Sequence, residues 1–191
     1  MNKFLLITGP SGVGKSAIID ELSKLDSRFV YISPYMTRPI RLGEKNKIAV
    51  SDEQMDEMWR RGELLAVNKL YGGIRYGTPR SPIIGALAIG SFPVLDWPID
   101  RLEIMKQAFP DRLFIVYVSP PSIDILHQRL KKDGRDTDGT RLANAKQEIQ
   151  KYWSLGRIGL CDLEVVSEDQ RIPEIAVNIY TSYLGSIKEI A

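Results

Sequence analysis

The sequence predicts an α/β fold in which helices flank a central parallel sheet. Three short apolar runs carry this prediction: Phe4–Thr8, Phe92–Asp96 and Leu113–Val118. Continuous apolar runs of this length are typical of strands buried on both faces of a parallel sheet. Segments with apolar residues at helical spacing alternate with them, as crossover helices would. The 191 residues, 43% of them hydrophobic, can bury one core, so a single domain over 1–191 is expected.

The first half of the chain gives a local reason for each expected element. After the first strand and its glycine-rich turn, a helix is expected with one apolar face: Ile18, Ile19, Leu22 and Leu25. Residues 28–33 predict a second strand, and the sequence Ser51-Asp52-Glu53-Gln54 has the form of a capping box that starts a short helix. Two small strands are expected within 64–76, and a helix over 82–87.

The second half continues the alternation. After the strand that ends at Asp96, the expected elements are, in order, a helix from near Pro98, a strand at 113–118, helices marked by Leu126 and by Ala145, a strand at 163–166 and a helix that starts at Pro173. This order again predicts a parallel sheet with helices between its strands.

The turn after the first strand has the composition of a phosphate-binding loop. Its glycines permit backbone conformations in which consecutive N–H groups curl around the phosphates of a nucleotide. Lys15 is expected to reach the outer phosphates, and the Ser16 hydroxyl to bind Mg²⁺. The following helix points its positive end at the same anion. The residues expected to contact the nucleotide are Gly9, Ser11, Gly12, Val13, Gly14, Lys15 and Ser16.

Composition excludes several classes of partner. The formal net charge of +2 is too small to predict nonspecific nucleic-acid binding, which needs a concentrated basic face. Cys161 is the single cysteine, so no intrachain disulfide can form and a reducing compartment is compatible. No apolar run approaches the roughly 20 residues that a bilayer requires, and the amino terminus leads directly into a strand. A soluble, cytoplasmic protein is expected.

Two pairs of arginines could supply further cations for phosphate chemistry. Arg38 and Arg41 lie three residues apart on a segment that contains proline and glycine, and Arg135 and Arg141 lie in a polar segment between two helices. Guanidinium groups suit phosphate oxygens, and a mobile polar loop can close over a substrate. Solvated surface arginines and a merely solvated connection are the alternatives.

Asp96 follows an apolar strand, where Mg²⁺-binding carboxylates occur in phosphate-loop proteins. Asp96 and Asp100 could each instead cap the helix that begins near Pro98, and Asp96 is the better candidate for metal or water coordination. His127, the single histidine, is expected to be structural or exposed. Packing roles are expected for the tryptophans: Trp59, Trp97 and Trp153.

The order of these motifs resembles the guanylate kinase family. GPSGVGKS, TRPIRLGE, YGTP, LD at a strand end, GRD and TRLANA together span almost the whole chain. The resemblance implies a P-loop NTPase fold with its core at 1–33 and 81–191, a small acceptor-binding insertion at about 34–80 and a mobile lid at about 134–141. It implies ATP as phosphoryl donor, Mg²⁺ held by Ser16 and Asp96, and GMP as the small-molecule acceptor.

The same resemblance implies a role for each candidate residue. Those expected in catalysis are Lys15, Arg38, Arg135 and Arg141, with Arg135 also near the triphosphate of ATP. Those expected at the acceptor are Arg38, Arg41, Glu44, Tyr76, Thr78 and Asp96; Glu44 would support the arginine loop, and Thr78 would touch the base.

Three positions depart from the guanylate kinase pattern. Pro34, Lys47 and Ala66 stand approximately where the family usually has a serine or threonine, a tyrosine, and a glutamate that pairs with guanine. Because an unpaired buried donor costs about 1–3 kcal/mol, loss of that carboxylate predicts weak discrimination among bases.

Two alternatives accompany the guanylate kinase interpretation. The segments 47–51 and 64–77 also resemble ribose bisphosphate phosphokinases, which need no base pocket, although Ser16, Thr78 and the sequence around Asp96 fit the nucleotide kinase better. A non-catalytic guanylate-kinase-like binding module is the other alternative. The intact Gly14-Lys15-Ser16 argues against it, since a scaffold has no reason to keep a triphosphate cradle.

Overall fold

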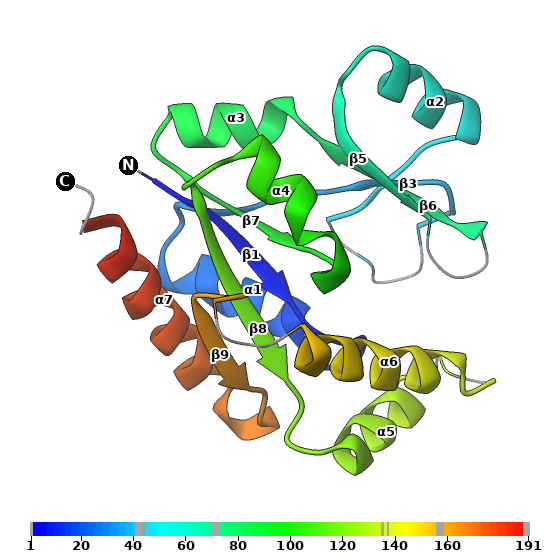
Figure 1. Ribbon diagram of the computed structural model, residues 1–191, viewed down its shortest axis with the longest axis vertical. Coiled ribbons are helices and arrows are strands. Elements are labelled where there is room, and N and C mark those ends of the chain that lie inside the picture. The colour runs from blue at the N-terminus through cyan, green and yellow to red at the C-terminus, as the bar shows by residue number, and fades with distance from the viewer. Residues whose placement is uncertain are drawn as a thin grey trace.

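A computed structural model describes residues 2–40, 44, 46–69, 73–134, 136, 138–155 and 159–188. Within these residues, a five-stranded parallel sheet has the order β2-β7-β1-β8-β9 (Figure 1). Its strands are β1 Phe4–Thr8, β2 Phe29–Tyr31, β7 Phe92–Asp96, β8 Leu113–Ser119 and β9 Leu163–Val166. The predicted parallel sheet is therefore confirmed. The second strand is shorter than the predicted 28–33, because only three of its residues pair with β7.

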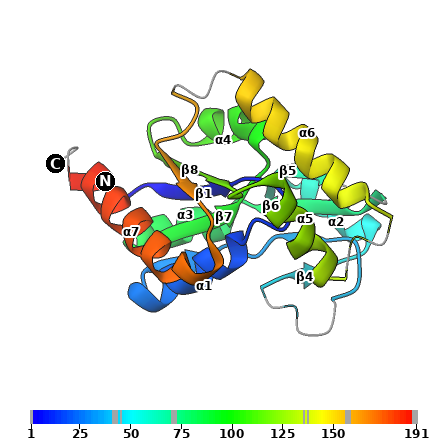
Figure 2. The ribbon, with the colours of Figure 1, turned by 90° about the horizontal axis from the view of Figure 1, so that it is seen from below.

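Helices cover both faces of this sheet, and β1 shows why. Its side chains alternate, so that Leu5 and Ile7 pack in one buried cluster and Phe4 and Leu6 in another. The first cluster is closed by α1 and α7, and the second by α3, α4 and the end of α6. Figure 2 shows α1 and α4 on opposite sides of the sheet. The helices are α1 Lys15–Leu25, α3 Ser81–Ala88, α4 Leu102–Ala108, α5 Ile123–Lys132, α6 Thr140–Ser154 and α7 Ile172–Lys188.

A second, smaller sheet lies beside the core, within the segment predicted as an insertion. Its strand order is β4-β3-β6-β5, and α2 packs on it (Figure 1). The elements are β3 Tyr35–Met36, β4 Ile48–Ala49, α2 Asp52–Arg60, β5 Leu64–Lys69 and β6 Arg75–Pro79. The predicted capping box is confirmed: Ser51 accepts a hydrogen bond from the Gln54 backbone N–H, and the Gln54 side chain accepts one from Ser51.

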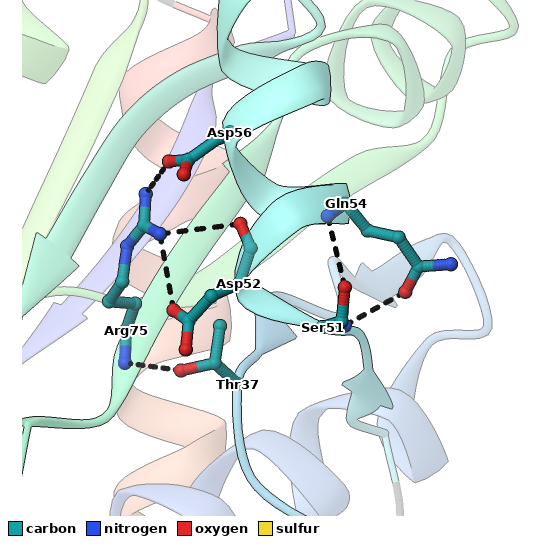
Figure 3. A network of polar contacts seen from close by, with 6 residues as sticks. All are labelled: Thr37, Ser51, Asp52, Gln54, Asp56 and Arg75. Atoms are coloured by element: carbon teal, nitrogen blue, oxygen red, sulfur yellow. Dashed lines mark hydrogen bonds and ion pairs between the residues drawn. The ribbon is translucent and has the colours of Figure 1, made fainter.

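A network of polar contacts ties α2 to this small sheet (Figure 3). The Arg75 guanidinium donates to the Asp52 and Asp56 carboxylates at 3.1 and 2.5 Å. The Arg75 backbone N–H donates to the Thr37 hydroxyl at 3.0 Å. Thr37 precedes Arg38 and Arg75 precedes Tyr76 in the sequence. The network therefore fixes the neighbours of two residues that are expected at the acceptor.

Several predicted packing roles are wrong in detail. Trp59 and Trp153 are 51% and 54% exposed, whereas Trp97 is buried at 3%. On α6 the buried aromatic is instead Tyr152, which stacks on Tyr117 of β8 at 3.5 Å between ring centroids. Leu25, the last residue of α1, is likewise exposed. His127 is exposed, which is one of the two alternatives expected for it.

None of the helices in the described ranges is long and apolar enough to cross a membrane.

Candidate active site

The loop between β1 and α1 has the geometry of an anion cradle. Gly9, Gly12 and Gly14 all have positive φ angles, of 138°, 84° and 98°. At Gly9 a Cβ atom would lie 2.2 Å from the Val118 carbonyl oxygen of β8, so no larger residue fits there. The Lys15 ammonium donates to the Gly9 carbonyl and, at 3.1 Å, to the Pro10 carbonyl. The predicted strand, loop and helix therefore hold a lysine over the loop.

The segment after β9 packs against the same loop, which sequence patterns did not indicate. A Cβ atom on Gly14 would lie 3.1 Å from the Ser167 hydroxyl. Arg129 of α5 donates to the Ser167 carbonyl at 2.7 Å and pairs with Asp169 at 2.8 Å. These residues extend the wall of the loop, and no local motif marks them, because their proximity depends on the pairing of β8 with β9.

Arg141, one of the two expected lid arginines, reaches the loop. Its guanidinium donates to the Ser11 hydroxyl at 2.6 Å and pairs with Asp133 at 3.3 Å. The Asp136 carboxylate accepts hydrogen bonds from the backbone N–H groups of Arg141 and Leu142, which anchors the start of α6. Arg141 is thus held by specific partners and is not a freely solvated side chain. Arg135 lies outside the described residues.

Asp96, at the carboxyl end of β7, faces cations from two directions. Its Oδ1 atom accepts a hydrogen bond from the Tyr31 hydroxyl at 2.6 Å and lies 3.7 Å from the Lys47 ammonium. Burial by itself would raise the pKa of Asp96, but attraction to Lys47, the Tyr31 hydrogen bond and attraction to Lys15 hold it below its usual value. The carboxyl is therefore ionised at neutral pH.

The capping alternative for Asp96 and Asp100 is not what the structure contains. The turn that leads into α4, η2 Ile99–Arg101, has Pro98 as its N-cap and no side-chain cap hydrogen bond. Asp100 instead pairs with Lys151 of α6 at 3.1 Å. Asp96 is therefore not a helix cap, and metal or water coordination by it stays a prediction.

Arg38, on the insertion, is held by Glu44. Two parallel hydrogen bonds of 2.7 and 2.5 Å join the guanidinium to the two carboxylate oxygens, and the Arg38 side chain is only 12% exposed. The Glu44 hydrogen bond, with a smaller contribution from Tyr76, raises the pKa of Arg38 against the lowering effect of burial. A cavity of about 340 Å³ opens beside Arg38. Glu44 therefore supports the arginine loop; Arg41 lies outside the described residues.

The two positions expected near the base are both buried. Thr78 of β6 pairs in register with Ala66 of β5, and these residues are 3% and 4% exposed. Ala66 packs with Ile32 and Leu95 in the core cluster. Contact between Thr78 and a base stays a prediction.

The chemistry of the donor atoms fits Mg²⁺. Ser16 is exposed in the first turn of α1, and the Asp96 carboxyl is ionised. Hydroxyl and carboxylate oxygens are hard ligands of the kind that Mg²⁺ prefers. The described part of the chain contains no group of three or more His, Cys, Asp or Glu residues that could hold a metal.

Comparison with known proteins gives a consistent family. Residues 1–164 match the family model of guanylate kinase. The guanylate kinase of Carboxydothermus hydrogenoformans is 34% identical over 199 aligned residues, which cover 97% of each chain. That of a Nostoc species is 31% identical and covers 87% of this chain and 83% of its own. The crystal structure of guanylate kinase from Anaplasma phagocytophilum superposes with a TM-score of 0.75 over 96% of this chain and 85% of its own, at 22% identity, and so shares its fold.

Proposed function

This chain belongs to the guanylate kinase family, and we propose that it transfers the γ-phosphoryl group of ATP to GMP, yielding ADP and GDP. One observation supports the proposal from the structure. A lysine-bearing phosphate loop follows β1 of the core sheet, and a carboxylate-locked arginine follows β3 of a separate small sheet. Lys47, next to β4 of that small sheet, reaches Asp96 at the end of β7 of the core sheet, so the two parts adjoin. A kinase needs two such phosphate sites, one for the donor and one for the acceptor.

On the donor side, the loop N–H groups and Lys15 would bind the phosphates of ATP. Arg141, already on the loop through Ser11, would turn to the transferring phosphoryl group together with Arg135. Ser16 and Asp96 would hold Mg²⁺, which supplies charge neutralisation when it is bound. Phosphoryl transfer places negative charge on oxygens that these cations surround, so no protein nucleophile is required.

On the acceptor side, Arg38 and Arg41 would hold the GMP phosphate with help from Tyr76. Glu44 fixes the plane of the Arg38 guanidinium before substrate arrives, which reduces the entropy lost on binding. Asp96 would orient the acceptor at the boundary of the two sites. Thr78 would contact the base, and the absence of a carboxylate at Ala66 predicts weaker discrimination between GMP and AMP than a site with every polar group paired.

An acceptor screen tests the proposal. Wild-type protein is incubated with ATP, Mg²⁺ and, in turn, GMP, dGMP, AMP, UMP or ribose 1,5-bisphosphate, and both products are quantified by chromatography. GDP formed in equal amount with ADP, at a higher kcat/KM than product from any other acceptor, is the expected result. Ribose bisphosphate, the alternative from the sequence, is not favoured over GMP by the family comparisons, and faster turnover of it would replace the proposal. ATP consumption with no acceptor would indicate a binding module or a hydrolase.

A further inference from the structure

Lys47 lies at the boundary between the small sheet and the core. It enters β4 of the small sheet, yet its ammonium donates to the hydroxyl of Tyr31 at the end of β2, at 2.7 Å. The Tyr31 hydroxyl in turn donates to Asp96 at the end of β7. Lys47 is thus a cation carried by the acceptor-side sheet and placed at the carboxyl edge of the core sheet.

Lys47 is held less firmly than the other cations near Asp96. Lys15 acts electrostatically on Asp96 and also on Glu148 of α6, and its ammonium donates to two backbone carbonyls. Arg38 has its own carboxylate in Glu44. Among the described residues, Lys47 forms an ion pair with Asp96 alone, at 3.7 Å, so an incoming phosphate can compete for its charge.

The Lys47 ammonium also has hydrogen-bonding capacity to spare. An ammonium carries three N–H donors, and Tyr31 accepts one of them. The distance of 3.7 Å to Asp96 is that of an ion pair and is too long for a hydrogen bond. The Lys47 side chain is 17% exposed and the Asp96 side chain beside it is 39% exposed, so the pair is partly open to solvent.

The surroundings of Tyr31 place this cation toward the acceptor. Burial is the main reason that the pKa of Tyr31 is raised, and the charges of Asp96, Tyr76 and Glu44 add to it. The Tyr31 hydroxyl therefore lies within electrostatic reach of the two residues that surround Arg38, and Lys47 is bonded to that hydroxyl. Strand pairing supports the same placement: Lys47 immediately precedes Ile48, which pairs with Tyr35 of β3, three residues before Arg38.

We propose that Lys47 contacts a non-bridging oxygen of the acceptor phosphate, on the side that faces Asp96, with Tyr31 as the residue that positions its ammonium. The proposal rests on the proposed function for the identity of the acceptor, and it adds to the arginines a phosphate-binding cation from the residue before β4. An ammonium suits this role because it acts as a compact charge on a long stem that can turn from Tyr31 to the incoming phosphate.

Equilibrium binding to the full chain tests the assignment without requiring turnover. Calorimetry measures the dissociation constants of GMP and of guanosine for wild type, Lys47→Met, Lys47→Arg and Lys69→Met. Lys47→Met keeps the stem length and removes the charge, so it should weaken GMP about 10- to 100-fold and leave guanosine within about twofold. Lys47→Arg retains a cation and should stay within about fivefold of wild type. Lys69→Met, an exposed lysine on β5 of the same sheet, should change neither constant.

Distinct outcomes separate this assignment from the proposed function. Equal weakening of GMP and guanosine by Lys47→Met would indicate a structural role and overturn the phosphate contact. So would unchanged GMP binding, or wild-type protein that binds GMP no more tightly than guanosine. Selective loss of GMP binding, in a protein that forms no GDP from ATP, would leave the Lys47 contact standing and remove the kinase function. Thermal unfolding of each variant shows that the compared proteins are folded.

Discussion

The proposed donor and acceptor sides of the site differ in what forms them. The donor loop is backbone, fixed between β1 and α1 and against β8, all of them anchored in a core of fully buried side chains. The acceptor side is side-chain chemistry on a small sheet: Arg38 with Glu44, and Arg75 with Asp52 and Asp56. Because of this difference, we expect substitutions on the donor side to lower the rate of the chemical step. Substitutions on the acceptor side should instead weaken binding of the acceptor.

The largest effect is expected from Lys15→Ala. Removing the ammonium deletes a charge aimed at the transferring phosphate, while the glycines still set the loop. We expect kcat to fall at least about 100-fold, with an unchanged thermal unfolding temperature. Steady-state kinetics and calorimetry check this result. More than about a tenth of wild-type kcat would count against a catalytic role for the loop.

Arg38→Ala should reveal the acceptor side. Loss of the guanidinium removes a charge-assisted contact to the acceptor phosphate and leaves Glu44 as an unpaired carboxylate. We expect the KM for GMP to rise about 10- to 100-fold, while the KM for ATP stays within about twofold. A paired control, Arg28→Ala, removes an exposed arginine that pairs with Asp26 and precedes β2, at the opposite end of that strand from Tyr31. Equal weakening of ATP and GMP by Arg38→Ala would place this loop on the donor side.

Arg75→Ala should give a smaller, indirect effect on the same side. It breaks the network behind Arg38 and Tyr76 (Figure 3). Asp52 and Asp56 are 62% and 59% exposed, so the free energy of unfolding should fall by only about 1 kcal/mol. The KM for GMP should rise about 3- to 10-fold with kcat almost unchanged. Arg61→Ala, which breaks an exposed pair with Glu57 on the same helix, is the matched control. A fall in kcat alone would contradict a positioning role.

The smallest expected effect is on the pH dependence of stability, through Glu148 on α6. Burial, which outweighs attraction to Lys15, and repulsion by Asp100 raise the pKa of Glu148 on α6. A carboxyl with a raised folded-state pKa destabilises the protein once it ionises, so stability is lost as pH rises through that pKa. Glu148→Gln should therefore raise the unfolding temperature at pH 7 by about 1–3 °C and have no effect below the ordinary pKa of 4.5. Glu103→Gln, at a side chain that is 76% exposed, should show no such pH dependence; a gain at low pH would contradict the assignment.

Local patterns predicted the strand, glycine loop and helix around Lys15. The apolar run, the positive-φ glycines, Lys15 and the start of α1 are contiguous in sequence, so each constrains its neighbours. The capping box at Ser51 was predictable for the same reason. On the proposed acceptor side, the family resemblance implied that Glu44 supports the arginine segment, and the structure pairs it with Arg38. Trp59 was misplaced, because α2 rests on a small sheet and buries only Met55.

The sequence by itself determined the alternation of strands and helices, the phosphate loop and the resemblance that gives the family. Only the tertiary structure decided that Tyr31 and Lys47 meet Asp96, from positions 65 and 49 residues away along the chain. The physical reason is that parallel strands bring their carboxyl ends to one edge, so the neighbours of a strand-end residue depend on which strands pair. The pairing of β2 with β7 is set by burial of their apolar side chains and not by any short motif.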